Sequence, residues 1–101
     1  MSRFVLSAGA ELDLNEIWDF IAQDNSDAAD RWIEKLFAAF ETLAHAPGIG
    51  HKREDLTGLP VRFWPVGAYM VIYRTLPKRV EIAAVTQGAR DIPSFLYQRT
   101  S

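Results

Sequence analysis

Residues Arg62 to Asp91, RFWPVGAYMVIYRTLPKRVEIAAVTQGARD, decide the fold of this chain. Three apolar runs, at residues 61–66, 68–76 and 80–85, are separated by a glycine and by a Pro-Lys-Arg turn, which is the pattern of short strands joined by tight turns. The middle run is the most continuously apolar, so we expect it to be central. The proline inside the first run favours an edge position or a strand end. The stretch therefore predicts a small, mainly antiparallel sheet.

Two amphipathic helices are predicted upstream of this sheet. Apolar residues recur at offsets of three and four from about residue 8 to 24, and again from about residue 26 to 46. Ser7 and Ser26 are the expected N-caps, and Pro47 ends the second helix. The connection between the helices is short, which predicts an antiparallel hairpin. The aromatic residues on the two stripes are expected in the core: Trp18, Trp32, Phe37 and Phe40.

The two ends of the chain complete the predicted architecture. Residues 3–6 form a β-type run, and residues 92–96 suggest a short terminal helix that packs Phe95 and Leu96. The element order is β-α-α-β-β-β with a short C-terminal helix. We therefore predict an α+β fold, with a helical hairpin on one face of the sheet, as a single domain spanning residues 1–101.

Composition excludes several kinds of chemistry. The chain has no cysteine, which removes disulfides, thiolate catalysis and cysteine-based zinc sites. Its two histidines, His45 and His51, do not have a recognisable metal-ligand spacing, so we expect neither a metal nor a cofactor. No stretch resembles a signal peptide or a membrane span, and the expected location is the cytoplasm.

Charge is divided unevenly along the sequence. From Met1 to Gly50 nine acidic residues face three basic ones, whereas from His51 onward eight basic residues face four acidic ones. Such a dipolar chain suggests that its basic part meets an anionic partner, although an acidic solvated helix face would give the same count. The formal net charge of −2 argues against tight, nonspecific binding to nucleic acid.

Four stretches, taken together and in order, resemble the ParE/RelE superfamily of toxins from type II toxin–antitoxin pairs. They are FVLSAGAELDLNEIWDFIAQDN, PGIGHKREDL, RFWPVGAYMVIYR and VTQGARDIPSFL. The resemblance implies the β-α-α-β-β-β fold and a cognate antitoxin that wraps the toxin. It also implies one of two activities. RelE-like members cut mRNA on the ribosome without a metal, whereas ParE-like members poison DNA gyrase by binding it.

The nuclease alternative needs a cation and proton-transfer groups. Arg62, Arg74 and Arg90 are the candidates for the cation. Relatives often carry a histidine where this chain has Gln87, and an amide cannot transfer protons. The remaining candidates for that role are His51 and Tyr97, in weaker positions.

We therefore favour the ParE-like alternative, with Arg53, Arg62, Arg74 and Arg90 as target-binding residues. Their structural alternative is pairing with acidic neighbours, namely Glu54, Asp55, Glu81 and Asp91. A non-toxic interaction module is a third possibility.

The partners implied by the resemblance are DNA gyrase and a ParD-like antitoxin, held as a hetero-oligomer. We expect an amphipathic antitoxin helix in a hydrophobic groove of the toxin, with a basic segment against the acidic helices. Operator DNA is expected to be bound only through the antitoxin.

Overall fold

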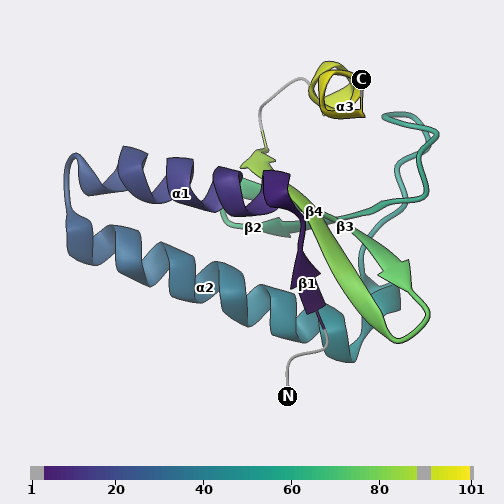
Figure 1. The fold of residues 1–101 in the computed structure, drawn as a ribbon, viewed down its shortest axis with the longest axis horizontal. Helices are drawn as coiled ribbons and strands as arrows, with labels where there is room; N and C mark the ends of the chain where they lie inside the picture. Colours follow the sequence, from purple (N-terminus) through teal and green to yellow (C-terminus); the bar gives the residue numbers. More distant parts are fainter. Residues whose placement is uncertain (1–3, 89–91, 101) are drawn as a thin grey trace.

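The computed structural model describes residues 4–88 and 92–100 and confirms the predicted α+β architecture (Figure 1). The elements follow in this order: β1 (Phe4–Leu6), α1 (Ala8–Ala22), α2 (Ser26–His45), a 3₁₀ helix (Pro47–Ile49), β2 (Arg62–Val66), β3 (Tyr69–Leu76), β4 (Arg79–Gln87) and α3 (Ile92–Thr100). Helix α1 is two residues shorter than predicted, and β4 extends further in both directions than its apolar run.

Only one of the two predicted helix N-caps agrees with the structure. Ser7 caps α1 as predicted, because its hydroxyl oxygen accepts a hydrogen bond from Ala10 N–H at 3.0 Å. Helix α2 is capped by Asn25, whose side-chain oxygen accepts from Ala28 N–H at 3.0 Å. The predicted cap, Ser26, is instead the first helical residue. The structure therefore favours the asparagine, which is an equally good cap one position earlier.

The sheet has the strand order β1-β4-β3-β2. Strand β2 lies at an edge, as its proline predicted, and β3 lies inside the sheet. The pairings β2–β3 and β3–β4 are antiparallel. Strand β1 instead pairs in parallel with β4, over Val80–Ile82. The three residues of β1 cover only part of the outer edge of β4, so the rest of that edge must be satisfied by other groups.

A β-bulge interrupts the pairing of β3 with β4. Ile72 pairs with Ala84 and Tyr73 pairs with Ile82, which leaves Ala83 without a partner on β3. One extra residue changes which side chains of a strand share a face. As a result, Val80, Ile82 and Val85 belong to one core cluster, whereas Ala84 belongs to the other.

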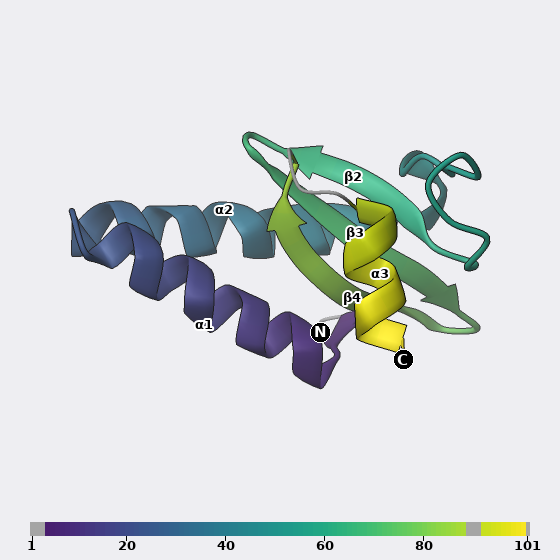
Figure 2. The ribbon, with the colours of Figure 1, turned by 90° about the horizontal axis from the view of Figure 1, so that it is seen from above.

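The sheet is covered on both faces (Figure 1). Side chains of α1 and α2, including Leu14, Leu36 and Phe40, pack on one face and form the larger core. Figure 2 shows α3 lying across the other face, where Phe95 and Leu96 are buried against Ile72 as predicted.

The prediction that all the stripe aromatics are core residues is wrong in two places. Phe40 is fully buried, but Trp18 and Phe37 each remain 36% exposed. They lie at the margins of the apolar stripes, where α1 and α2 meet at the surface of the hairpin. Among the described residues, no helix is both long enough and apolar enough to cross a membrane.

Candidate functional site

Three of the predicted site residues line one surface groove. Arg53, Arg62 and Arg74 surround a hollow of about 430 Å³ between the loop that precedes β2 and the strands β2 and β3. We call it the arginine groove. Its lining consists of Lys52, Arg53, Glu54, Thr57, Gly58, Leu59, Pro60, Val61, Arg62, Arg74 and Thr75. The fold thus gathers basic side chains that are separated by up to 22 positions in the sequence.

Two of these arginines hold acidic partners. Arg53 donates two hydrogen bonds to Asp55, from Nε at 3.0 Å and from Nη2 at 2.8 Å. This hydrogen bonding raises the pKa of Arg53 and lowers the pKa of Asp55. Arg74 Nε donates to Glu81 Oε1 across the sheet at 2.7 Å, and about half of the Arg74 side chain stays exposed. Both pairs lie at the surface, where they add little to stability.

Arg62 does not form the ion pair that was its structural alternative. Its Nη1 donates to the carbonyl oxygen of Gly50 at 3.0 Å. The same turn is held by Tyr73, whose buried hydroxyl donates to Pro47 O at 2.7 Å and accepts from Gly50 N–H at 2.9 Å. Burial raises the pKa of Tyr73. Arg62 and Tyr73 together fix the backbone that leads into the loop of the arginine groove.

The proton-transfer candidates do not join the arginines. His51 is exposed and exchanges backbone hydrogen bonds of 2.8 Å with Phe63, and its ring stacks on Trp64. It is absent from the lining of the arginine groove, and the described residues of that lining include neither histidine nor tyrosine. Arg90 and the side chain of Tyr97 lie outside the described part of the chain. Gln87 lies elsewhere, at the far end of β4.

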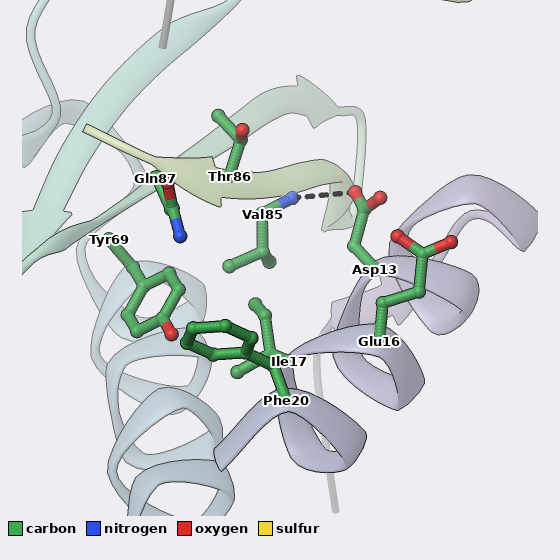
Figure 3. A pocket seen from close by; sticks show the side chains of 8 residues that line it. All are labelled: Asp13, Glu16, Ile17, Phe20, Tyr69, Val85, Thr86 and Gln87. Atoms are coloured by element: carbon green, nitrogen blue, oxygen red, sulfur yellow. Dashed lines mark hydrogen bonds between the residues drawn. The ribbon is translucent and has the colours of Figure 1, made fainter. Parts of the chain in front are cut away.

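A second pocket, of about 210 Å³, lies between α1 and the end of β4. Figure 3 shows the apolar side chains of Ile17, Phe20 and Tyr69 gathered on one side of it, with the carboxylates of Asp13 and Glu16 on the other. We call it the edge pocket. Gln87 contributes to its lining, and none of the described residues that line this pocket is an arginine.

Asp13 is the residue of the edge pocket that the sequence interpretation missed. As an acidic residue it was not counted with the apolar stripe of α1, yet it is only 7% exposed. Its carboxylate accepts a hydrogen bond from Val85 N–H at 2.9 Å and another from Arg99 Nη2 at 2.8 Å. One signal in the sequence could have revealed it: Asp13 follows Ala10 by three positions and precedes Ile17 by four, which is the spacing of the buried stripe.

A third hollow lies on the helical hairpin. It has a volume of about 370 Å³, and we call it the hairpin groove; it is lined by Leu6, Glu11, Leu14, Asn15, Trp18, Ile33 and Phe37. Trp18 is held there by a hydrogen bond from Nε1 to Asp30 Oδ1 at 2.8 Å. The groove is mainly apolar and has a single acidic side chain at its margin. Among the residues that the structure describes, no group of three or more histidine, aspartate or glutamate side chains could hold a metal ion.

These features define a small α+β protein with surface grooves, in which no histidine or tyrosine of the described residues lines the arginine groove. The sequence profile of a family described as "ParE toxin of type II toxin-antitoxin system, parDE" matches residues 4–92. The chain belongs to this family of ParE toxins.

Comparison with solved structures supports the same fold. A structure described as "Chromosomal ParDE TA system from P. aeruginosa" superposes with a TM-score of 0.70, covering 86% of this chain and 96% of that one. The two sequences are 18% identical, so this likeness concerns the fold. A comparison with curated protein sequences gave no match.

Proposed function

We propose that this chain is a cytoplasmic toxin that inhibits DNA gyrase by binding it and that a cognate ParD-like antitoxin neutralises. Membership of the ParE family supports the toxin class. The observation that carries the proposed mode of action is the composition of the arginine groove, whose described lining gathers cations without a histidine or tyrosine. Such a groove can hold an anionic group, and its described lining offers no histidine or tyrosine for proton transfer.

The chemistry of RNA cleavage explains why these parts matter. A base must remove the proton of the 2′-hydroxyl, a cation must stabilise the charge on phosphorus, and an acid must protonate the leaving oxygen. Arg53, Arg62 and Arg74 supply positive charge only. His51 is held outside the groove by its pairing with Phe63, which supports binding rather than catalysis as the role of this surface.

The hairpin groove is the proposed seat of the antitoxin. Its lining suits the apolar face of an amphipathic helix, which is a common mode of peptide recognition. Glu11 lies at the groove, and most of the other acidic residues of α1 and α2 are exposed, so they favour a helix flanked by basic residues. We propose a toxin–antitoxin hetero-oligomer in which operator DNA is contacted through the antitoxin.

The test compares two activities of the same purified toxin. In a gyrase supercoiling assay we expect inhibition that is relieved when the antitoxin is added first. In a translating extract we expect mRNA to remain intact at the same toxin concentration. Codon-phased mRNA cleavage together with normal supercoiling would overturn the proposal in favour of a RelE-like ribonuclease. A chain that inhibits neither process and leaves growth unaffected would be an interaction module instead.

A further inference from the structure

The arginine groove continues into a further hollow, mainly apolar and distinct from the edge pocket and the hairpin groove, on the α3 face of the sheet. This hollow measures about 200 Å³, and it shares Leu59, Pro60, Val61 and Arg74 with the arginine groove. Its floor includes Ile72, which is fully buried, and one wall is Leu96 of α3. The two hollows therefore form one continuous surface feature, which is basic at one end and mainly apolar at the other, where the ion-paired Glu81 and Arg99 also contribute to the lining.

The β-bulge explains why the apolar end is hollow. Because Ala83 is the extra residue in β4, it and Ala84 both line this side of the sheet instead of alternating between faces. Two adjacent methyl groups fill less space than the larger side chains around them, such as Ile72 and Leu96. A volume of about 200 Å³ is suited to one large apolar side chain of a partner, in the way that interface anchors fill pockets.

The charge at the basic end is small once the partners are counted. Among the residues that the structure describes, four cations line the arginine groove: Lys52, Arg53, Arg62 and Arg74. Three carboxylates lie with them, since Glu54 is part of the lining, Asp55 holds Arg53 and Glu81 holds Arg74. One positive charge is left in excess. That balance suits a single carboxylate, whereas a nucleic-acid strand needs several uncompensated cations for its phosphates.

We propose that the continuous groove docks a protein segment of the gyrase target that carries a large apolar side chain beside an acidic residue. The apolar side chain enters the hollow over Ile72 and Ala84, and the acidic residue lies near Arg62 and Arg74. This inference rests on the proposed function, because it names what that function's target presents to the toxin. The apolar hollow lies on the α3 face of the sheet, away from the hairpin groove.

The experiment uses Leu59, which lies in both hollows and is 39% exposed. A Leu59→Asp variant places a carboxylate at the apolar end without disturbing a buried side chain. We expect the toxin concentration needed to inhibit gyrase holoenzyme to rise about thirtyfold or more, the effect of losing an interface anchor. Leu12→Asp is the matched control, since Leu12 is 57% exposed on α1 and lines none of the hollows described above. We expect it to inhibit gyrase like the wild type.

Three readouts decide between possible occupants. Circular dichroism should show that both variants fold, and binding of the antitoxin to Leu59→Asp should be unchanged. Equal gyrase inhibition by wild type and Leu59→Asp would overturn the inference while leaving the proposed function intact. A wild type that fails to inhibit gyrase would overturn both.

Two other molecules could occupy the groove, the antitoxin or a nucleic acid, and each would give a different result. Weaker antitoxin binding by Leu59→Asp would assign the groove to the antitoxin and overturn the inference. Wild-type binding to a short DNA duplex that is lost in Leu59→Asp would assign it to nucleic acid. A second variant, Lys52→Glu, tests the basic end of the groove, and we expect it to weaken gyrase inhibition about tenfold. Unchanged inhibition by this variant would contradict the role given to the excess positive charge.

Discussion

The carboxylate of Asp13 accepts a hydrogen bond from the backbone N–H of Val85 at 2.9 Å, across 72 positions of sequence. Strand β1 pairs with β4 only as far as Ile82, so Val85 N–H lies on the edge that β1 leaves uncovered. Ser7 also bonds this edge, because its hydroxyl donates a hydrogen bond to the carbonyl oxygen of Ala83 at 2.9 Å. Side chains from the start of α1 thus replace the missing length of β1.

Asp13→Ala should reduce the free energy of unfolding by about 1–3 kcal/mol, because Val85 N–H would be buried without an acceptor. Asp13→Asn should cost less, since its amide oxygen can still accept that bond. Urea denaturation followed by circular dichroism measures both. Glu16→Ala is the control, an exposed acidic residue of the same pocket, and should stay within about 0.5 kcal/mol of the wild type. A similar loss in Asp13→Ala and Glu16→Ala would contradict this role of Asp13.

The Tyr73 hydroxyl makes the free energy of unfolding depend on pH in the alkaline range. Its pKa is raised by burial above the ordinary value of 10.0, so the neutral form favours the folded state. The stabilisation is fully present below about pH 10 and is lost as pH rises through the folded-state pKa. In urea denaturation, the free energy of unfolding of the wild type should be lower at about pH 11 than at about pH 8. The decrease should be smaller for Tyr73→Phe.

The same variant has a cost at neutral pH. Tyr73→Phe leaves the N–H of Gly50 without its buried acceptor and should lower the free energy of unfolding by about 1–3 kcal/mol. Ultraviolet absorbance of tyrosinate during an alkaline titration reports the folded-state pKa directly. If all tyrosines of the folded chain titrated together at their ordinary pKa, the structural role assigned to this hydroxyl would be wrong.

The turn between β2 and β3 requires glycine at position 67. Gly67 has a φ of +59°, and a Cβ there would lie 2.6 Å from Cη2 of Trp32. Gly67→Ala should therefore destabilise the protein by about 1–3 kcal/mol, measured by thermal or urea unfolding. Gly58→Ala is the matched control, because a Cβ added there would meet nothing within 4 Å and the φ of Gly58 is not positive. Equal stability of the two variants would refute this requirement.

Arg74→Ala separates target binding from folding. The ion pair with Glu81 is about half exposed on the arginine side, so its loss should change stability by no more than about 1 kcal/mol. We expect gyrase inhibition to weaken about tenfold, as for a contributing interface residue. Lys78→Ala, in the exposed turn before β4, should inhibit like the wild type. Inhibition that is unaffected by Arg74→Ala would remove this residue from the target-binding set.

Asn15→Arg should block the hairpin groove without disturbing the core, because Asn15 is exposed on α1 and lines that groove. We expect its affinity for the antitoxin to fall at least tenfold in isothermal titration calorimetry, while gyrase inhibition by the free toxin is retained. Gln23→Arg introduces the same charge at the C-terminal end of α1, outside the groove, and should bind the antitoxin normally. Equal loss in both variants would indicate a charge effect rather than occlusion of the groove.

The elements of this fold were predictable because each has a strong local pattern. Helices α1 and α2 follow from apolar spacing, and strands β2, β3 and β4 from apolar runs between turn residues. The parallel partner of β1 was not predictable, since three residues carry no information about which strand they join. The bulge at Ala83 arises from the pairing of β3 with β4, and the sequence of either strand alone does not predict it.

The site was predictable only in part. Arg53, Arg62 and Arg74 were selected as target-binding residues, and the fold brings these three into one groove. That role remains a prediction. The hydrogen-bond partners of the arginines were less predictable, because Arg62 donates to the backbone carbonyl of Gly50 rather than to a carboxylate. Asp13 was overlooked, since its burial depends on the uncovered edge of β4, which lies far from it in the sequence.

The parallel pairing of β1 with β4 also orders events during synthesis. Ser7 and Ala83 are 76 positions apart, so the first strand cannot dock until nearly the whole described chain has left the ribosome. Closing so long a loop is slow compared with forming the hairpin of α1 and α2. The hairpin carries most of the proposed antitoxin groove and can therefore form before the sheet, although Leu6 of β1 completes that groove only when the first strand docks. A growing chain would thus present most of the proposed antitoxin surface earlier than the proposed target surface.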